Sequence, residues 1–195
     1  MDYGETMKKK QVEDRFEMRL SGSGGQGLVL AGVMIAEAVG VYEGKNVAQT
    51  QSYGPEARGG TSRSDLVISE DEIYYPKTSE LDLLLALTQE AADKYYTHLK
   101  TNGILIVDSE IVRQLPPYSK IYSLPFTRTA REEIGTTLVA NVISAAALVT
   151  ISGICKQESF LNAVLNRAPK GTESKNEKAC KLGFEMGKKA LKGET

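Results

Sequence analysis

The stretch 16–37 reads FEMRLSGSGGQGLVLAGVMIAE and decides the fold class of this 195-residue chain. Phe16, Met18 and Leu20 alternate with charged residues, and this period-two pattern predicts a strand that ends at Ser21. A turn of six residues follows, four of them glycines. Residues 28–41 are then almost entirely apolar, which predicts a helix covered on most of its surface. Strand, glycine turn and buried helix are the first half of a βαβ unit.

The rest of the chain alternates in the same way. Short apolar runs bounded by turn signals predict further strands, and longer runs predict helices. Strands are predicted at 46–51, 65–69, 81–87, 104–107 and 118–124, with 73–75 continuing a hairpin; helices are predicted at 89–99, 128–134, 138–151, 157–166 and 172–191. This order predicts one α/β domain over residues 15–195, with a helical C-terminal segment and a flexible leader over residues 1–14.

Composition excludes several classes of function. The formal net charge of -1 argues against nucleic acid as a partner, because binding to a phosphate backbone grows with the number of phosphates neutralised. The two cysteines cannot supply the four thiolates of an iron–sulfur cluster, and they fit a reducing cytoplasm. The most apolar stretch, 138–154, contains polar residues and predicts a buried helix, so no membrane association is expected.

The glycine turn is the first candidate site. Gly22, Gly24 and Gly27 satisfy the pattern G-x-G-x-x-G between a strand and a helix, where backbone amides and the helix N-terminus suit a diphosphate. An ordinary NAD site would also place an acidic residue after the second strand, but that position holds Thr50, Gln51 and Ser52. The alternative is that the glycines only allow close packing of helix and strand.

The second candidate site is the polar loop at 49–62. It carries Tyr53, Glu56 and Arg58, which can stack, accept a hydrogen bond and donate through a guanidinium fork. If the first two strands are parallel neighbours, this loop and the glycine turn meet at the carboxyl edge of the sheet. The alternative is a solvated surface loop with an internal Glu56–Arg58 pair.

Other polar or reactive residues have simpler interpretations. His98 is expected to be a solvated histidine at a helix end, and Asp108 a cap or turn residue after its strand. Cys155 and Cys180 are expected to be packing residues. We find no pattern typical of a nucleophile–base pair or of a metal site, and therefore assign no catalytic or metal-binding residue.

The motifs GSGGQG at 22–27 and SYGPEARGG at 52–60 resemble the gamma subunit of 2-oxoacid:ferredoxin oxidoreductases. The resemblance covers nearly the whole chain after residue 14. Within that family, the form of the second motif is most similar to the 2-oxoglutarate enzymes, while pyruvate-type or indolepyruvate-type gamma subunits remain an alternative. The resemblance implies a Rossmann-like three-layer α/β domain.

The resemblance also implies a reaction shared among several chains. A 2-oxoacid is decarboxylated on thiamine diphosphate with Mg, electrons pass through iron–sulfur clusters to ferredoxin, and the acyl group leaves on coenzyme A (CoA). The partners would be alpha and beta (thiamine-binding) subunits and a ferredoxin-like delta subunit. This chain would hold none of those cofactors by itself and would serve CoA handling and assembly. The residues implied to contact CoA phosphate or line a subunit junction are Gly22, Gly24, Gly25, Gln26, Gly27, Tyr53, Glu56, Arg58, Gly59 and Gly60. A stand-alone nucleotide-binding module and a scaffold subunit are the competing hypotheses.

Overall fold

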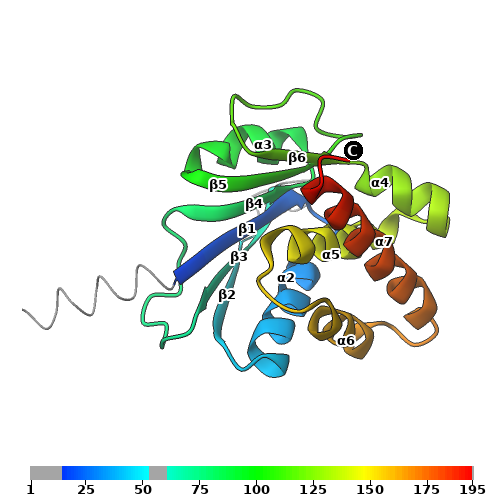
Figure 1. Ribbon diagram of the computed structural model, residues 1–195, viewed down its shortest axis with the longest axis horizontal. Coiled ribbons are helices and arrows are strands. Elements are labelled where there is room, and N and C mark those ends of the chain that lie inside the picture. Colours follow the sequence, from blue (N-terminus) through cyan, green and yellow to red (C-terminus); the bar gives the residue numbers. More distant parts are fainter. Residues whose placement is uncertain (1–14, 53–60, 195) are drawn as a thin grey trace, which may run out of the picture.

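A mixed six-stranded sheet forms the centre of the molecule in the computed structural model, which describes residues 15–52 and 61–194 (Figure 1). The strand order is β2-β3-β1-β4-β5-β6. β1, β4, β5 and β6 run parallel, whereas β3 is antiparallel to both β1 and β2. The strands are β1 (Arg15–Ser23), β2 (Asn46–Ser52), β3 (Thr61–Ser69), β4 (Leu81–Ala86), β5 (Leu99–Asp108) and β6 (Ile121–Leu124).

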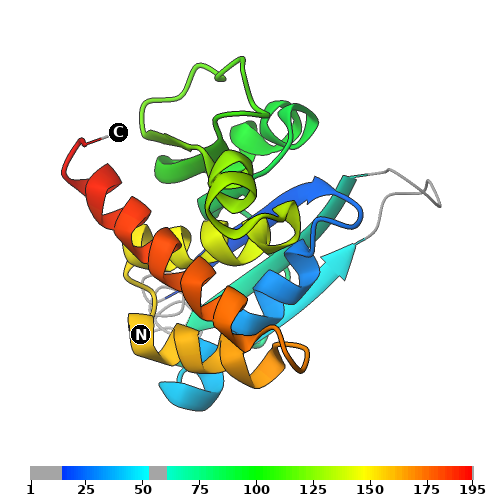
Figure 2. The same ribbon diagram turned by 90° about the vertical axis from the view of Figure 1, so that its right-hand side faces the viewer.

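Helices cover both faces of this sheet, which confirms the predicted α/β class with three layers. The larger core contains buried residues of α2, α5, α6 and α7, and a smaller core on the other face contains α3. Figure 2 shows α7 running across the larger helical layer. The helices are α2 (Leu28–Glu37), α3 (Gln89–Tyr95), α4 (Phe126–Thr129), α5 (Ala140–Ser152), α6 (Gln157–Arg167) and α7 (Glu173–Leu191), with π-helical turns Ala38–Tyr42 and Ala130–Ile134 after α2 and α4.

The expected neighbour relation between the first two strands is wrong. β3 lies between β1 and β2, and β2 is the edge strand. The physical reason is the polarity of β2: strands buried on both faces are apolar, whereas β2 is half-exposed to exposed along its length and reads NVAQTQS. The apolar residues 66–68 of β3 fill the more central position instead.

Several boundaries also differ from the sequence expectation, and one predicted strand is absent. The helix predicted at 89–99 ends in a 3₁₀ turn at His98, and β5 begins at Leu99. No strand forms at 73–75: Tyr74 and Tyr75 are 72% and 58% exposed, so they bury too little surface to hold a hairpin. Arg15 instead holds this loop by donating to the carbonyl oxygen of Tyr75 at 2.7 Å.

A buried ion pair lies between β1 and β3. The guanidinium of Arg19 donates to both carboxylate oxygens of Asp65, at 2.7 and 2.8 Å, and the two residues are 4% and 5% exposed. The same guanidinium stacks on the ring of Tyr95 at 4.6 Å from its centroid. His98 is exposed at the end of a helical turn, as the sequence predicts, and its Nδ1 lies 3.2 Å from the Arg19 guanidinium. Its pKa is lowered by partial burial first and then by the charges of Arg19 and Arg63.

The expectations for Asp108 and the cysteines are confirmed. Asp108 is fully buried and accepts hydrogen bonds from the backbone N–H of Glu110 and from both the N–H and the hydroxyl of Thr127. It therefore fixes the chain where β5 and β6 end. Cys155 and Cys180 are buried in the larger core, and burial raises the pKa of each thiol to about 12. Both thiols are therefore protonated at neutral pH.

The apolar stretch at 138–154 forms the buried helix that the sequence predicted. It is α5, with eleven buried residues, and it packs closely against α7. A Cβ added at Gly183 of α7 would lie 2.3 Å from the carbonyl oxygen of Ile143 in α5, so this glycine allows the two backbones to touch. Within the described residues, no helix combines the length and apolarity needed to cross a membrane.

Candidate functional site

The glycine turn lies at the carboxyl ends of β1 and β4, where the connections that follow these two strands diverge. β1 and β4 are parallel neighbours, but β1 leads into α2 on the larger helical face, whereas β4 leads into α3 on the opposite face. Open α/β sheets bind their ligands in the crevice that such diverging connections leave at the carboxyl ends of the strands. The hydrogen bond from Leu87 N–H to the carbonyl oxygen of Ser21 fixes the two strand ends beside each other at 2.9 Å. The turn at 22–27 is therefore placed at the edge where a ligand is expected.

The side chain of Gln26 stabilises the turn through a hydrogen bond to its backbone. Its side-chain oxygen accepts a hydrogen bond of 2.7 Å from the backbone N–H of Ser23. A Cβ at Gly22 would lie 2.2 Å from that oxygen, so Gly22 leaves the space that the glutamine side chain occupies. Two of the predicted site residues thus have a structural role within the turn itself.

Gly25 and Gly27 have positive φ angles of 89° and 72°. Nothing lies within 4 Å of the position that a Cβ of Gly25 would take, so this part of the turn is open. At Gly27 the same position lies 2.5 Å from the side-chain nitrogen of Asn141, which donates to the Gly27 carbonyl oxygen at 3.1 Å. Gly27 is therefore required both by its backbone conformation and by the approach of α5.

The N-terminus of α2 fits an anion. Gly27 occupies the N-cap position and provides no side-chain cap, and the first turn of α2 contains no acidic residue. The first N–H groups of a helix have no partner within the helix, and together with the helix dipole they favour negative charge. The turn and helix can thus receive a phosphate group without displacing a carboxylate from the helix's own first turn.

The second predicted loop lies largely outside the described residues. The predicted site residues that lie outside are Tyr53, Glu56, Arg58, Gly59 and Gly60. The residues that flank them are placed: Ser52 ends β2 and pairs with Arg63, and Thr61 begins β3 and pairs with Ser23 at the end of β1. Both ends of this segment therefore lie at the edge of the sheet that carries the glycine turn.

Sequence reasoning missed several residues around the turn. Ser21 donates to the carbonyl oxygen of Ser62, and the Thr61 hydroxyl donates to Glu90 at 2.5 Å. Asn141 was not among the predicted site residues, although an amide inside an otherwise apolar helix was a usable signal. It is 5% exposed, and its side-chain oxygen has no hydrogen-bond partner among the described residues.

Comparison with known proteins shows the family of this chain. Residues 17–186 match the family described as pyruvate ferredoxin/flavodoxin oxidoreductase. The chain belongs to this family. It is 45% identical to 2-oxoglutarate synthase subunit KorC of Methanocaldococcus jannaschii, over 93% of this chain and 99% of that protein. It is 42% identical to subunit KorC of Methanothermobacter thermautotrophicus, over 90% and 96% of the two chains.

A solved structure of the same family has the same fold. The gamma subunit of a keto/oxoacid ferredoxin oxidoreductase from Geobacter sulfurreducens superimposes with a TM-score of 0.84, at 44% identity, over 90% of this chain and 98% of that one. The resemblance carried by residues 22–27 and 52–60 is confirmed. This member of the pyruvate ferredoxin/flavodoxin oxidoreductase family aligns with that gamma subunit over nearly the full length of both chains.

Proposed function

We propose that this chain is the gamma subunit of a 2-oxoglutarate:ferredoxin oxidoreductase. The observation that carries the proposal is the 45% identity to a 2-oxoglutarate synthase subunit over nearly the full length of both chains. The complete enzyme would convert 2-oxoglutarate, CoA and oxidised ferredoxin into succinyl-CoA, carbon dioxide and reduced ferredoxin. The alpha and beta subunits would hold thiamine diphosphate and Mg, and the delta subunit would supply iron–sulfur clusters. We place this assembly in the cytoplasm.

Within the complex, the glycine turn would bind a phosphate of CoA. Three features of the described residues support this role: the open space at Gly25, the α2 N-terminus without an acidic residue in its first turn, and the position between β1 and β4. The chain would act by binding and orienting CoA, and the redox chemistry would belong to its partners. A scaffold role, in which a partner backbone occupies the turn, is the competing proposal.

The substrate proposal is tested by rebuilding the enzyme from purified subunits. Reduction of ferredoxin should require this chain together with the other subunits, and each alone should be inactive. With CoA present, 2-oxoglutarate should give a kcat/KM at least about tenfold above that of pyruvate or 2-oxoisovalerate. A preference for pyruvate, or full turnover without this chain, would contradict the proposal.

Arg58 provides the test of CoA binding. A guanidinium can bind a phosphate through two parallel hydrogen bonds, whereas a lysine offers a point charge. We expect both Arg58→Lys and Arg58→Ala to raise the KM for CoA about tenfold or more while kcat changes little. Arg63→Ala is the matched control and should keep the wild-type KM for CoA, because the half-exposed Arg63 side chain pairs with Asp65. Wild-type kinetics in Arg58→Ala would remove this loop from the proposed CoA site.

A further inference from the structure

A second crevice opens at the carboxyl edge of the sheet, between β5 and β6. The chain leaving β5 turns toward the α3 face, where Val112 joins the smaller core. The chain leaving β6 turns to the other face, where Phe126 joins the larger core. The two connections therefore diverge, as they do around the glycine turn. The buried carboxylate of Asp108 accepts hydrogen bonds from the backbone of both connections and so holds their first residues close together. The topological rule that marks the first site marks this position as well.

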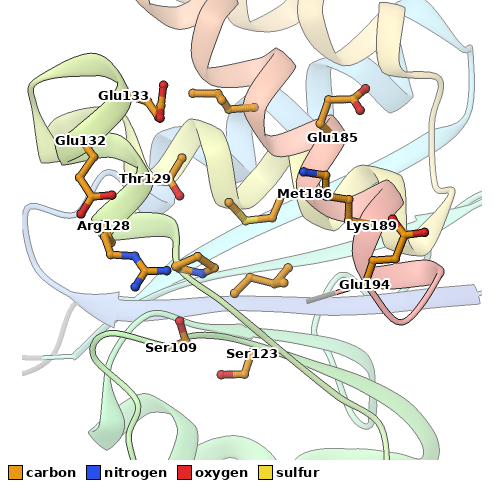
Figure 3. A pocket seen from close by; sticks show the side chains of 13 residues that line it. Ser109, Ser123, Arg128, Thr129, Glu132, Glu133, Glu185, Met186, Lys189 and Glu194 are labelled. Atoms are coloured by element: carbon orange, nitrogen blue, oxygen red, sulfur yellow. The ribbon is translucent and has the colours of Figure 1, made fainter.

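A cavity of about 490 Å³ lies at this crevice. Its walls come from the ends of β5 and β6, from α4 with its π-helical turn, and from the last turns of α7. Figure 3 shows Arg128 at one end, on the side of Ser109, and Lys189 at the other end, with Met186 between them. Ser123, Leu124 and Pro125 also line the cavity. The arrangement is two cationic ends joined by an apolar middle, with serine hydroxyls beside one end.

The two cations are available to a ligand. Neither Arg128 nor Lys189 forms an ion pair with a described residue, whereas most other arginines of the described chain do. Because the two groups lie at opposite ends of one cavity, an anion with two charged ends can reach both of them.

Two of the four acidic side chains at the rim, Glu133 and Glu185, have cations of their own. Glu185 pairs with Lys188 at 2.9 Å, and this contact lowers the pKa of the Glu185 carboxyl. Glu133 lies 3.9 Å from Lys178, whereas Arg131, the cation next to Glu132 in the sequence, pairs with Glu110. Glu132 on the side of Arg128 and Glu194 on the side of Lys189 line the cavity without an ion pair among the described residues, so these two acids compete with an incoming anion.

We propose that this cavity binds a small dicarboxylate. One carboxylate lies in the fork of the Arg128 guanidinium, with the hydroxyls of Ser109 and Ser123 as further donors. The second carboxylate lies against Lys189, and the carbon chain between them packs on Met186 and Leu124. The site lies outside the glycine turn, and it does not depend on the function proposed above.

Binding to the purified chain by isothermal titration calorimetry tests this site without partner subunits or turnover. The probes are succinate and glutarate, with acetate, butyrate and inorganic phosphate as comparisons. We expect the dicarboxylates to bind at least about tenfold tighter than butyrate or phosphate, because only they reach both cations. Arg128→Gln and Lys189→Gln should each raise the Kd for glutarate about tenfold, and Glu194→Gln should lower it.

Two matched controls separate a site from a general effect of charge. Arg113→Gln removes an exposed arginine of the β5–β6 connection, and Lys181→Gln removes an exposed lysine of α7 that pairs with Glu177; neither residue lines the cavity. Both should keep the wild-type Kd. The proposal is overturned if glutarate binds no tighter than butyrate, if Arg128→Gln binds like the wild type, or if the two controls weaken binding as much as the cavity variants. Because this experiment uses only the free chain, a negative result would not contradict the function proposed above, which the assay of the rebuilt enzyme tests separately.

Discussion

Replacing Arg19 by methionine should lower the free energy of unfolding by about 3–5 kcal/mol, because it leaves the buried carboxylate of Asp65 without its main partner. Both side chains are almost fully buried, and the guanidinium makes two hydrogen bonds to the carboxylate and stacks on Tyr95. Methionine fills a similar volume, so the loss reports the uncompensated charge more than a cavity. Urea denaturation of the purified chain, with constant m-value, measures the change.

A double variant distinguishes this cause from a loss of packing. Arg19→Met combined with Asp65→Leu removes both charges and should recover most of the lost stability, since an apolar pair can replace a buried ion pair. Lys181→Met removes an exposed helix-surface pair with Glu177 and should leave the free energy of unfolding nearly unchanged. Additive losses in the double variant would show that the ion pair is not the source of the effect.

Gly27→Val should be the most damaging single change at the glycine turn. A β-branched residue at a φ of 72° is strained, and its Cβ would also meet the amide of Asn141. We expect the free energy of unfolding to fall by about 2–4 kcal/mol. In the assembled enzyme, the KM for CoA should rise as the turn is displaced from the position that would hold a phosphate. Denaturation of the free chain and CoA titration of the complex measure the two effects.

Gly135→Val is the matched control for that variant. Gly135 has a φ of 82° and open space at its Cβ position, so valine brings the backbone strain without a clash and far along the chain from the turn. It should cost stability but leave the KM for CoA at its wild-type value. If Gly27→Val assembles with normal CoA affinity, or if both variants raise the KM equally, the turn does not bind CoA. If Gly27→Val only prevents assembly of the complex, the result would support the competing proposal of a scaffold role.

The local elements were predictable because their signals are local. The alternation of Phe16, Met18 and Leu20, the glycines and the apolar run after Leu28 each act over a few residues, and β1, the turn and α2 form where those signals lie. The strand order was not predictable in the same way. It depends on whether β2 or β3 buries more apolar surface beside β1, and that comparison involves residues about 50 positions apart.

The same difference between local signals and long-range packing applies to the candidate site. Its glycines carry a sequence pattern with a physical meaning, and the structure places them at the opening between β1 and β4. Asn141 reaches Gly27 from 114 positions away, and no spacing rule connects the two. The second cavity was also beyond sequence reasoning, because Arg128 and Lys189 look like ordinary surface cations until α7 is packed beside α4.

The buried cysteines make the chain a convenient object for spectroscopy. The sequence contains only two, and both are covered by the core and protonated at neutral pH. A cysteine introduced on the surface, for example in place of the exposed Leu138 beside the start of α5, would therefore be the one thiol that reacts readily with a maleimide. A single fluorophore or spin label placed in this way could follow the docking of partner subunits in real time, with no background mutations needed to remove native thiols.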